Sequence, residues 1–202
     1  MNNEFVYLDE QLPGIRWDAK YATWDNFTGR PVDGYLANRI VGTRALGEAL
    51  ERARDEAASH GFGLLIWDAY RPQRAVDDFV LWSRRPEDGR TKPRHYPNIE
   101  RAQMFDLGYV AAKSGHSRGG TVDLTLYRTA TGELAEMGGD HDLMDSVSHH
   151  GADGIPELEA LNRLRLRSIM EASGFCSYPA EWWHYTLRSE PHPDTYFDFP
   201  IT

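Results

Sequence analysis

Residues 114–123, with the sequence SGHSRGGTVD, constrain this chain more than any other stretch. Their glycines predict a tight turn, and residues 122–127 then alternate between apolar and polar side chains. An alternation with a period of two predicts a strand whose apolar side chains face a core while Asp123 faces the other side. His116 precedes this strand across the turn, so an imidazole and a carboxylate can converge on one point.

Such a pair indicates a metal site, and the C-terminal part of the chain supplies the groups that it lacks. Zinc binds imidazole nitrogen and carboxylate oxygen, and a hydrolytic zinc site has three protein ligands and a water. His184 offers the third ligand, and Glu181 offers a general base beside it. Because a regular strand would place these two residues on opposite faces, we expect Glu181 in the turn before the strand. Arg71 is the candidate cation for an oxyanion.

Each of these residues also has a structural interpretation that spacing alone leaves open. His116 could be a turn histidine, and His184 a core histidine beside two tryptophans. Asp68 and Arg71 lie where a buried strand is predicted to end and a helix to begin, so they could simply fix the turn. The adjacent pair 149–150 is not expected to share a metal, because neighbouring side chains on an extended chain point apart.

Hydrophobic periodicity predicts the other elements of the chain. In the last helix, the buried side is expected at Leu158, Leu161, Leu164, Arg165 and Ile169. We expect short strands at residues 5–8, 15–17 and 21–24, a buried central strand at 62–67, a final strand at 181–187, and helices at 43–60, 72–83, 99–107 and 156–173.

The composition narrows the class of protein. A length of 202 residues with 41% hydrophobic residues predicts one domain, residues 1–202. The net charge of -9 and the lack of a Lys/Arg block argue against nucleic acid as a partner. A single cysteine, Cys176, excludes an intrachain disulfide. The first residues lack a signal-peptide pattern, and no stretch has the ~20 apolar residues of a membrane span, so we expect a cytoplasmic protein without a membrane partner.

The pattern Ser114-x-His116-x-x-Gly119-x-x-x-Asp123, followed by Glu181-x-x-His184, resembles that of the zinc D-alanyl-D-alanine peptidases. That superfamily includes carboxypeptidases, dipeptidases and the hedgehog signalling domain. Residues 17–29 (WDAKYATWDNFTG), 67–72 (WDAYRP) and 196–200 (YFDFP) narrow the resemblance to the VanX-type D-alanyl-D-alanine dipeptidases, and it extends over nearly the whole chain. The resemblance implies an α+β fold, with a central antiparallel sheet and helices packed around it.

The resemblance also implies a role for each site residue. His116, Asp123 and His184 would hold one Zn²⁺ per chain, Glu181 would be the general base and acid, and Arg71 would stabilise the tetrahedral intermediate.

Further residues would contact or support the substrate site. Asp142 and Tyr21 would hold the free amino group of the dipeptide. Ser114 and Tyr35 would contact its C-terminal end, and Asp68 would support the arginine turn. Two positions depart from the usual pattern, which has alanine at 121 and often glycine at 69, but neither change removes a ligand or a catalytic group.

The implied activity is zinc-dependent hydrolysis of D-Ala-D-Ala to two D-alanines, which would deplete the cell-wall precursor that vancomycin-type antibiotics recognise. The partner would be this small-molecule substrate, and the resemblance suggests a homodimer, although the sequence shows no heptad pattern. Two alternatives remain: a D,D-carboxypeptidase or endopeptidase of the same superfamily, and a non-catalytic zinc-bearing binding module. The presence of both Glu181 and Arg71 favours an enzyme over the binding module.

Overall fold

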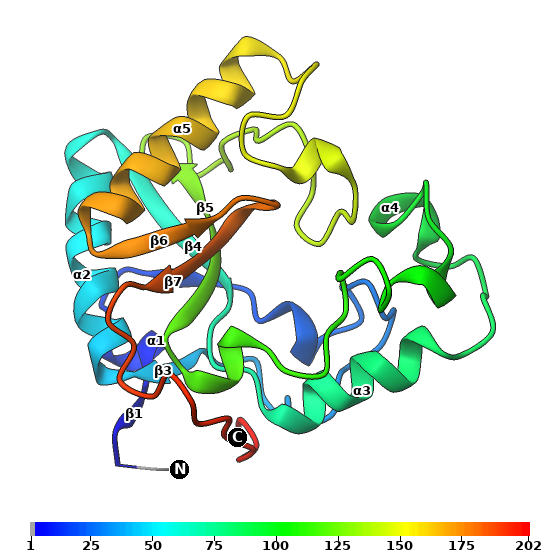
Figure 1. The fold of residues 1–202 in the computed structure, drawn as a ribbon. Helices are drawn as coiled ribbons and strands as arrows, with labels where there is room; N and C mark the ends of the chain where they lie inside the picture. Colours follow the sequence, from blue (N-terminus) through cyan, green and yellow to red (C-terminus); the bar gives the residue numbers. More distant parts are fainter. Residues whose placement is uncertain (1–2) are drawn as a thin grey trace.

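A computed structural model describes residues 3–202, so Met1 and Asn2 of the predicted domain lie outside it. Its centre is a five-stranded sheet, which Figure 1 shows between two groups of helices. In spatial order the strands are β2 (Arg16–Trp17), β4 (Phe62–Asp68), β5 (Thr121–Arg128), β7 (Glu181–Leu187) and β6 (Phe175–Tyr178). The edge strand β2 pairs in parallel with β4, and the other pairs are antiparallel. The predicted α+β fold is confirmed, with a sheet that is mixed at this one edge.

Helices α2 (Arg44–Ser59) and α5 (Glu157–Ala172) pack against the sheet, whereas α3 (Gln73–Ser83) and the short α4 (Lys92–His95) lie on the other side in Figure 1. The remaining elements are short. They are α1 (Leu8–Gln11), the two-stranded sheet of β1 (Phe5–Tyr7) and β3 (Val41–Thr43), and the 3₁₀ helices η1 (Lys20–Ala22), η2 (Arg101–Gln103), η3 (Gly115–Arg118) and η4 (Ser146–Ser148). Within residues 3–202, no helix is both long and apolar enough to cross a membrane.

Helix α2 and strand β4 begin and end within one residue of where the sequence signals predict. The Thr43 side chain accepts a hydrogen bond from the Leu46 amide and so caps the helix. Gly61 has a φ of +77°, which allows the chain to turn directly into the strand. All residues of β4 except Leu65 are buried, as expected for a central strand covered on both faces.

Two of the predicted elements are wrong in type or extent. Residues 21–24 form no strand: η1 covers Tyr21, and the Asn26 side chain donates to the carbonyls of Lys20 and Thr23, which a strand would need for its ladder. The helix predicted at 99–107 is only the single turn η2, followed by turns in which the amides of residues 109 and 110 both donate to the Met104 carbonyl. In both places, hydrogen bonds of local side chains and turns replace the backbone hydrogen bonds of the expected strand or helix.

The expected buried face of α5 is right at Ile169, which is 2% exposed, but wrong at its three leucines. Leu158, Leu161 and Leu164 are 49%, 48% and 61% exposed. The helix instead buries Asn162 and Arg163 together with its C-terminal apolar residues. These two polar side chains donate to backbone carbonyls of the loop that precedes the helix. In the first half of the helix, hydrophobicity alone therefore selects the wrong side.

Candidate active site

The turn before β5 fixes the first histidine. Ser114 accepts a hydrogen bond from the amide of His116 at the start of η3, and Gly119 ends this turn with a φ of +78°. The His116 Nδ1 lies 2.7 Å from the Ala69 carbonyl oxygen, which can only accept a hydrogen bond. Nδ1 is therefore the protonated nitrogen, and Nε2 is free to act as a ligand on the other side of the ring.

Strand pairing brings the other two predicted ligands to the same point. Asp123 on β5 lies directly opposite His184 on β7. The His184 Nδ1 is 3.0 Å from Asp123 Oδ1, and the His116 Nε2 is 3.2 Å from Asp123 Oδ2. The two imidazole nitrogens are 3.3 Å apart. All three ligand atoms thus lie within 4.8 Å of one another, as one small cation requires.

The chemistry of this donor set fits a catalytic zinc ion. Two ring nitrogens and one carboxylate oxygen make the three-ligand set of a hydrolytic zinc site, which leaves one position for water. The side chains of His116 and Asp123 are buried, whereas that of His184 is 19% exposed toward the cavity. Burial opposes ionisation of Asp123, but the neighbouring histidines outweigh it and hold the pKa of this carboxyl well below its usual range. The buried carboxylate is therefore charged and can bind a cation.

Glu181 lies beside this centre, off the ligand set. It is the first residue of β7 rather than part of the preceding turn, and the pairing with β6 shifts register next to it, at residues 177–178. This irregularity allows Glu181 and His184 to face the same space, with Oε2 of the glutamate 3.5 Å from Nδ1 of the histidine. Burial raises the pKa of Glu181 to about 7, the range in which a carboxyl can both take up and give back a proton near neutral pH.

Arg71 reaches the centre from the end of β4. Its Nε and Nη2 are both 2.9 Å from Asp68 Oδ2, and Nη2 is 3.6 Å from Asp123 Oδ2. The Arg71 amide also donates to the His116 carbonyl, so the arginine turn and the histidine turn are joined. Tyr35 donates to the other oxygen of Asp68. The guanidinium is thus held by a buried acid, with one edge directed at the metal centre.

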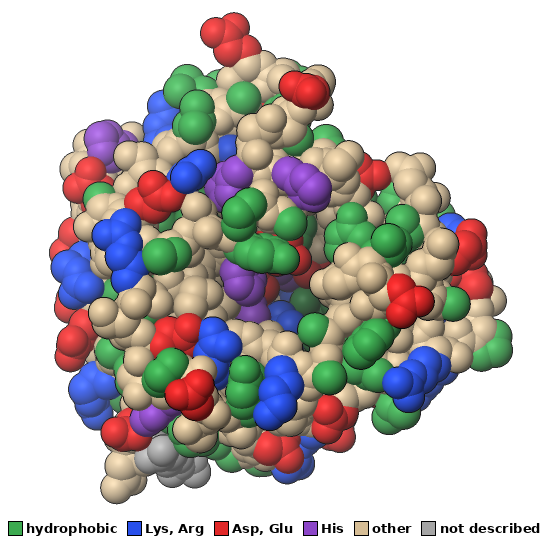
Figure 2. Space-filling view, in the orientation of Figure 1, with side chains coloured by type: hydrophobic (Ala, Val, Ile, Leu, Met, Phe, Trp, Pro, Cys, Tyr) green, Lys and Arg blue, Asp and Glu red, His purple; other side chains and the backbone are tan. Residues whose placement is uncertain are grey.

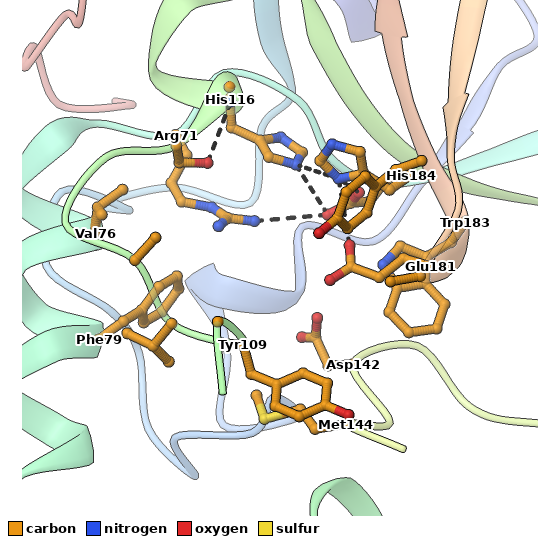
Figure 3. Close-up of a pocket in the computed structure, with 18 of the residues that line it drawn as sticks. Arg71, Val76, Phe79, Tyr109, His116, Asp142, Met144, Glu181, Trp183 and His184 are labelled. Atoms are coloured by element: carbon orange, nitrogen blue, oxygen red, sulfur yellow. Dashed lines mark hydrogen bonds and ion pairs between the residues drawn. The ribbon is translucent and has the colours of Figure 1, made fainter. Parts of the chain in front are cut away.

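These groups surround a cavity of about 270 Å³. Figure 2 shows the hollow at the centre of one face, with histidine, acidic and basic side chains at its floor, and Figure 3 shows Arg71, Glu181 and Asp142 around the same space. Tyr35 and Asp68 do not line the cavity and lie behind Arg71. The eight other predicted site residues do line it: Tyr21, Arg71, Ser114, His116, Asp123, Asp142, Glu181 and His184.

The chain is similar to known proteins over its whole length. Residues 1–202 match the family described as D-ala-D-ala dipeptidase. The chain belongs to this dipeptidase family. A D-alanyl-D-alanine dipeptidase of Streptomyces coelicolor is 72% identical over 201 residues, and one of Enterococcus faecalis is 60% identical over 202 residues, each match covering 100% of both chains. One of Escherichia coli is 34% identical and covers 91% of this chain and 84% of its own. The family predicted from the sequence motifs is confirmed.

The side of this dipeptidase cavity opposite the metal centre is formed by a loop at residues 137–149. The Tyr21 hydroxyl donates to Asp142 Oδ2 at 2.9 Å, and Asp142 takes a left-handed φ of +57°. The two residues that the resemblance assigned to the amino group therefore do lie together. His149 and His150 do not line the cavity.

Sequence reasoning missed two histidines that lie against Asp142, beside the cavity of this dipeptidase. His141 is buried, with Nε2 at 3.6 Å from Asp123 Oδ2 and 3.5 Å from Asp142 Oδ1, so it lies between the metal centre and the amino-group side. Its position next to Asp142 in the sequence was the one available signal. His95 is also buried: its Nδ1 lies 3.2 Å from the Asp142 carbonyl oxygen, and its own carbonyl accepts a 2.7 Å hydrogen bond from the Met144 amide. No sequence pattern connects residues 95 and 144.

Proposed function

We propose that this protein is a zinc-dependent dipeptidase that hydrolyses D-Ala-D-Ala to two D-alanines. The observation that carries the proposal is that Glu181 and Arg71 both face one ligand set of His116, Asp123 and His184 inside a small cavity. A structural zinc site needs ligands alone, whereas a hydrolase also needs a base and a cation off the metal. The family of the chain and the names of its relatives support the same substrate.

The residues of the site divide the reaction between them. When bound, zinc supplies Lewis-acid activation of the attacking water and of the scissile carbonyl. Glu181, in its ionised form, takes a proton from the water and then donates it to the nitrogen of the leaving D-alanine. Arg71 places a fixed positive charge where the carbonyl oxygen becomes negative, and its bonds to Asp68 remove the need to reorganise it during the reaction.

The cavity also explains a preference for a free dipeptide. Asp142, oriented by Tyr21, offers a carboxylate to the ammonium group, and Ser114 lies on the side assigned to the C-terminal end. The volume of about 270 Å³ suits a dipeptide better than a pentapeptide precursor. Tyr35 is best given a supporting role behind Arg71, because its hydroxyl is bonded to Asp68.

In the cell, this activity would remove D-Ala-D-Ala before it enters cell-wall precursors, and so favour precursors that vancomycin-type antibiotics bind poorly. That role requires an enzyme in the cytoplasm, where the free dipeptide is assembled. A homodimer remains a prediction from the family resemblance, and no part of the catalytic proposal depends on it.

The test is release of D-alanine from D-Ala-D-Ala, with and without a chelator, followed by addition of zinc. We expect release that the chelator abolishes and zinc restores, with one zinc per chain by elemental analysis. A pentapeptide ending in D-Ala-D-Ala is assayed in parallel, and comparable turnover would show a D,D-carboxypeptidase instead. Bound zinc without hydrolysis of either peptide would favour the binding module.

A further inference from the structure

The loop that carries Asp142 is closed at its base by one arginine of α5. Arg163 donates from Nε to the Met137 carbonyl at 2.5 Å and from Nη1 to the carbonyls of Val147 and His149 at 2.7 and 3.1 Å. The loop, yellow-green in Figure 1, leaves and returns at the side of α5. A single guanidinium therefore joins the first residue of the loop to its last ones.

The neighbouring residue adds a fourth bond to the same anchor. The Asn162 side chain donates to the Glu136 carbonyl at 2.9 Å, one residue before the loop begins. Asn162 and Arg163 are 0% and 3% exposed, so these bonds are shielded from water. A buried backbone carbonyl that loses its donor is costly, and the loop ends therefore depend on these two side chains.

The charge of Arg163 is unusual for a buried position. Among the described residues it forms no ion pair with a carboxylate, and its hydrogen bonds go to carbonyl oxygens alone. Burial lowers its pKa to about 10, so it still carries its charge at neutral pH. A buried cation without a partner acid is expensive, and the planar fork of arginine is what lets one side chain reach both ends of the loop.

The tip of the loop is bonded to Tyr21 and His95 rather than to α5. Asp142 accepts from the Tyr21 hydroxyl, and the Met144 amide donates to the His95 carbonyl. Asp142 itself has a left-handed backbone, which persists only where the surroundings fix it. The position of its carboxylate is thus set at the tip of the loop by Tyr21 and by His95, whose Nδ1 lies 3.2 Å from the Asp142 carbonyl oxygen, and at the base of the loop by Arg163.

We propose that Arg163 is a positioning residue that sets the specificity of the enzyme for a free amino terminus, by holding the loop 137–149 so that Asp142 faces the cavity. This inference rests on the proposed function, because it assigns Asp142 to the ammonium group of the dipeptide. Arg163 contacts neither the metal ligands nor the cavity, so its effect falls on binding of the amino end and not on the chemical step.

The experiment compares Arg163→Lys with Arg167→Lys, which changes an arginine on the same helix that is bonded to Glu171 near the surface. In Arg163→Lys the KM for D-Ala-D-Ala should rise about tenfold or more, because small displacements of a positioning group are costly. The kcat should change by less than about threefold, as expected when a binding interaction is lost. Zinc should remain at one per chain, and the preference for D-Ala-D-Ala over N-acetyl-D-Ala-D-Ala should fall. Arg167→Lys should behave as the wild type.

Unchanged KM and unchanged preference in Arg163→Lys would overturn the proposal, and so would a fall in kcat at constant KM. If Arg163→Lys does not fold, Asn162→Ala removes one bond of the same anchor and is read in the same assays, with a smaller rise in KM expected. Should the wild type not hydrolyse the dipeptide, the proposed function fails by itself. Amide hydrogen exchange over residues 138–148 then tests the anchor: faster exchange in Arg163→Lys than in Arg167→Lys supports it, and equal exchange refutes it.

Discussion

The Tyr35 hydroxyl donates a 2.6 Å hydrogen bond to Asp68 Oδ1, behind the cavity and out of reach of a substrate. The other oxygen of Asp68 binds the guanidinium of Arg71. Both oxygens of a carboxylate that is 1% exposed are therefore satisfied by these two partners. This arrangement makes Tyr35 part of the support of Arg71.

Tyr35→Phe should therefore reduce both stability and activity. The change leaves one oxygen of buried Asp68 without its donor, which should cost about 1–3 kcal/mol in the free energy of unfolding. Arg71 should lose its fixed position, so kcat should fall while zinc content stays the same. Urea denaturation and steady-state kinetics measure both effects. Tyr7→Phe is the control, since its hydroxyl donates to the Thr202 carbonyl far from the site. A rise in KM alone in Tyr35→Phe would instead indicate a substrate contact.

Glu181→Gln should slow the chemical step by on the order of 10²–10⁴, because the amide cannot take up the proton of the attacking water. Zinc content should be unchanged, since Glu181 is not in the ligand set. Single-turnover kinetics and elemental analysis test the two statements together. Glu48→Gln, on the exposed side of α2, serves as the control. Full activity in Glu181→Gln would show that the base is misassigned.

Substitution of two aspartates on opposite sides of the cavity should affect the zinc content differently. Asp123→Ala removes a ligand and should lose the metal, with activity lost as a consequence. Asp142→Ala should keep one zinc per chain, because Asp142 lies outside the ligand set. It should weaken binding of the dipeptide, because the carboxylate proposed to bind its ammonium group is lost. Elemental analysis after dialysis distinguishes the two variants. Stoichiometric zinc in Asp123→Ala would refute the assignment of this ligand.

The stability of the metal-free protein should depend on pH through Glu181. Burial raises the pKa of this carboxyl from 4.5 to about 7, so the folded protein holds the proton more tightly than the unfolded chain does. The resulting stabilisation is fully present below pH ~4.5 and is lost as the pH rises through about 7. Each pKa unit corresponds to about 1.4 kcal/mol, so a shift from 4.5 to about 7 sets an upper limit of ~3.5 kcal/mol.

Urea denaturation of metal-free wild type and Glu181→Gln at pH 5 and pH 8 checks this prediction. The wild type should lose more stability than the variant between the two values, because glutamine does not titrate. Parallel losses in the two proteins would show that the carboxyl is not perturbed by burial. Addition of zinc should reduce the difference, since a cation favours the ionised form of a nearby carboxylate.

The parts of this site that were predictable from sequence are those encoded by neighbouring residues. His116 lies in a turn and Asp123 on the strand that follows it directly, so spacing and alternation identify them as a pair. The direct pairing of Asp123 with His184 depends on the register of β5 against β7, and no local pattern contains that register. Glu181 illustrates the same limit, because its orientation depends on an irregular pairing with β6.

The missed features are those in which polar side chains replace apolar ones in the interior. Arg163 is buried because the loop carbonyls need donors, so a hydrophobic pattern places it on the wrong face of α5. His95 and His141 both lie against Asp142, in the loop whose ends Arg163 holds. Such roles arise from contacts between distant segments, and they become visible only in the folded chain.

A last prediction concerns Gly119, which lies in the turn between the proposed metal ligands His116 and Asp123. Its φ is +78°, its amide donates to the His116 carbonyl, and its own carbonyl accepts from the amide and hydroxyl of Thr43. A Cβ at this position would collide with the ring of Phe5. Gly119→Ala should therefore cost more than the strain of a left-handed alanine alone, with a total of about 2–4 kcal/mol in the free energy of unfolding.

Gly61→Ala is the matched control for this change, because its φ of +77° is nearly the same and no atom lies within 4 Å of the added Cβ. It should cost only about 1 kcal/mol. Since Gly119 closes the turn that positions His116, its substitution should also weaken zinc binding, whereas Gly61→Ala should leave it unchanged. Urea denaturation and zinc titration of both variants measure these effects. Equal losses of stability with equal zinc affinity would mean that the contact with Phe5 does not constrain the turn.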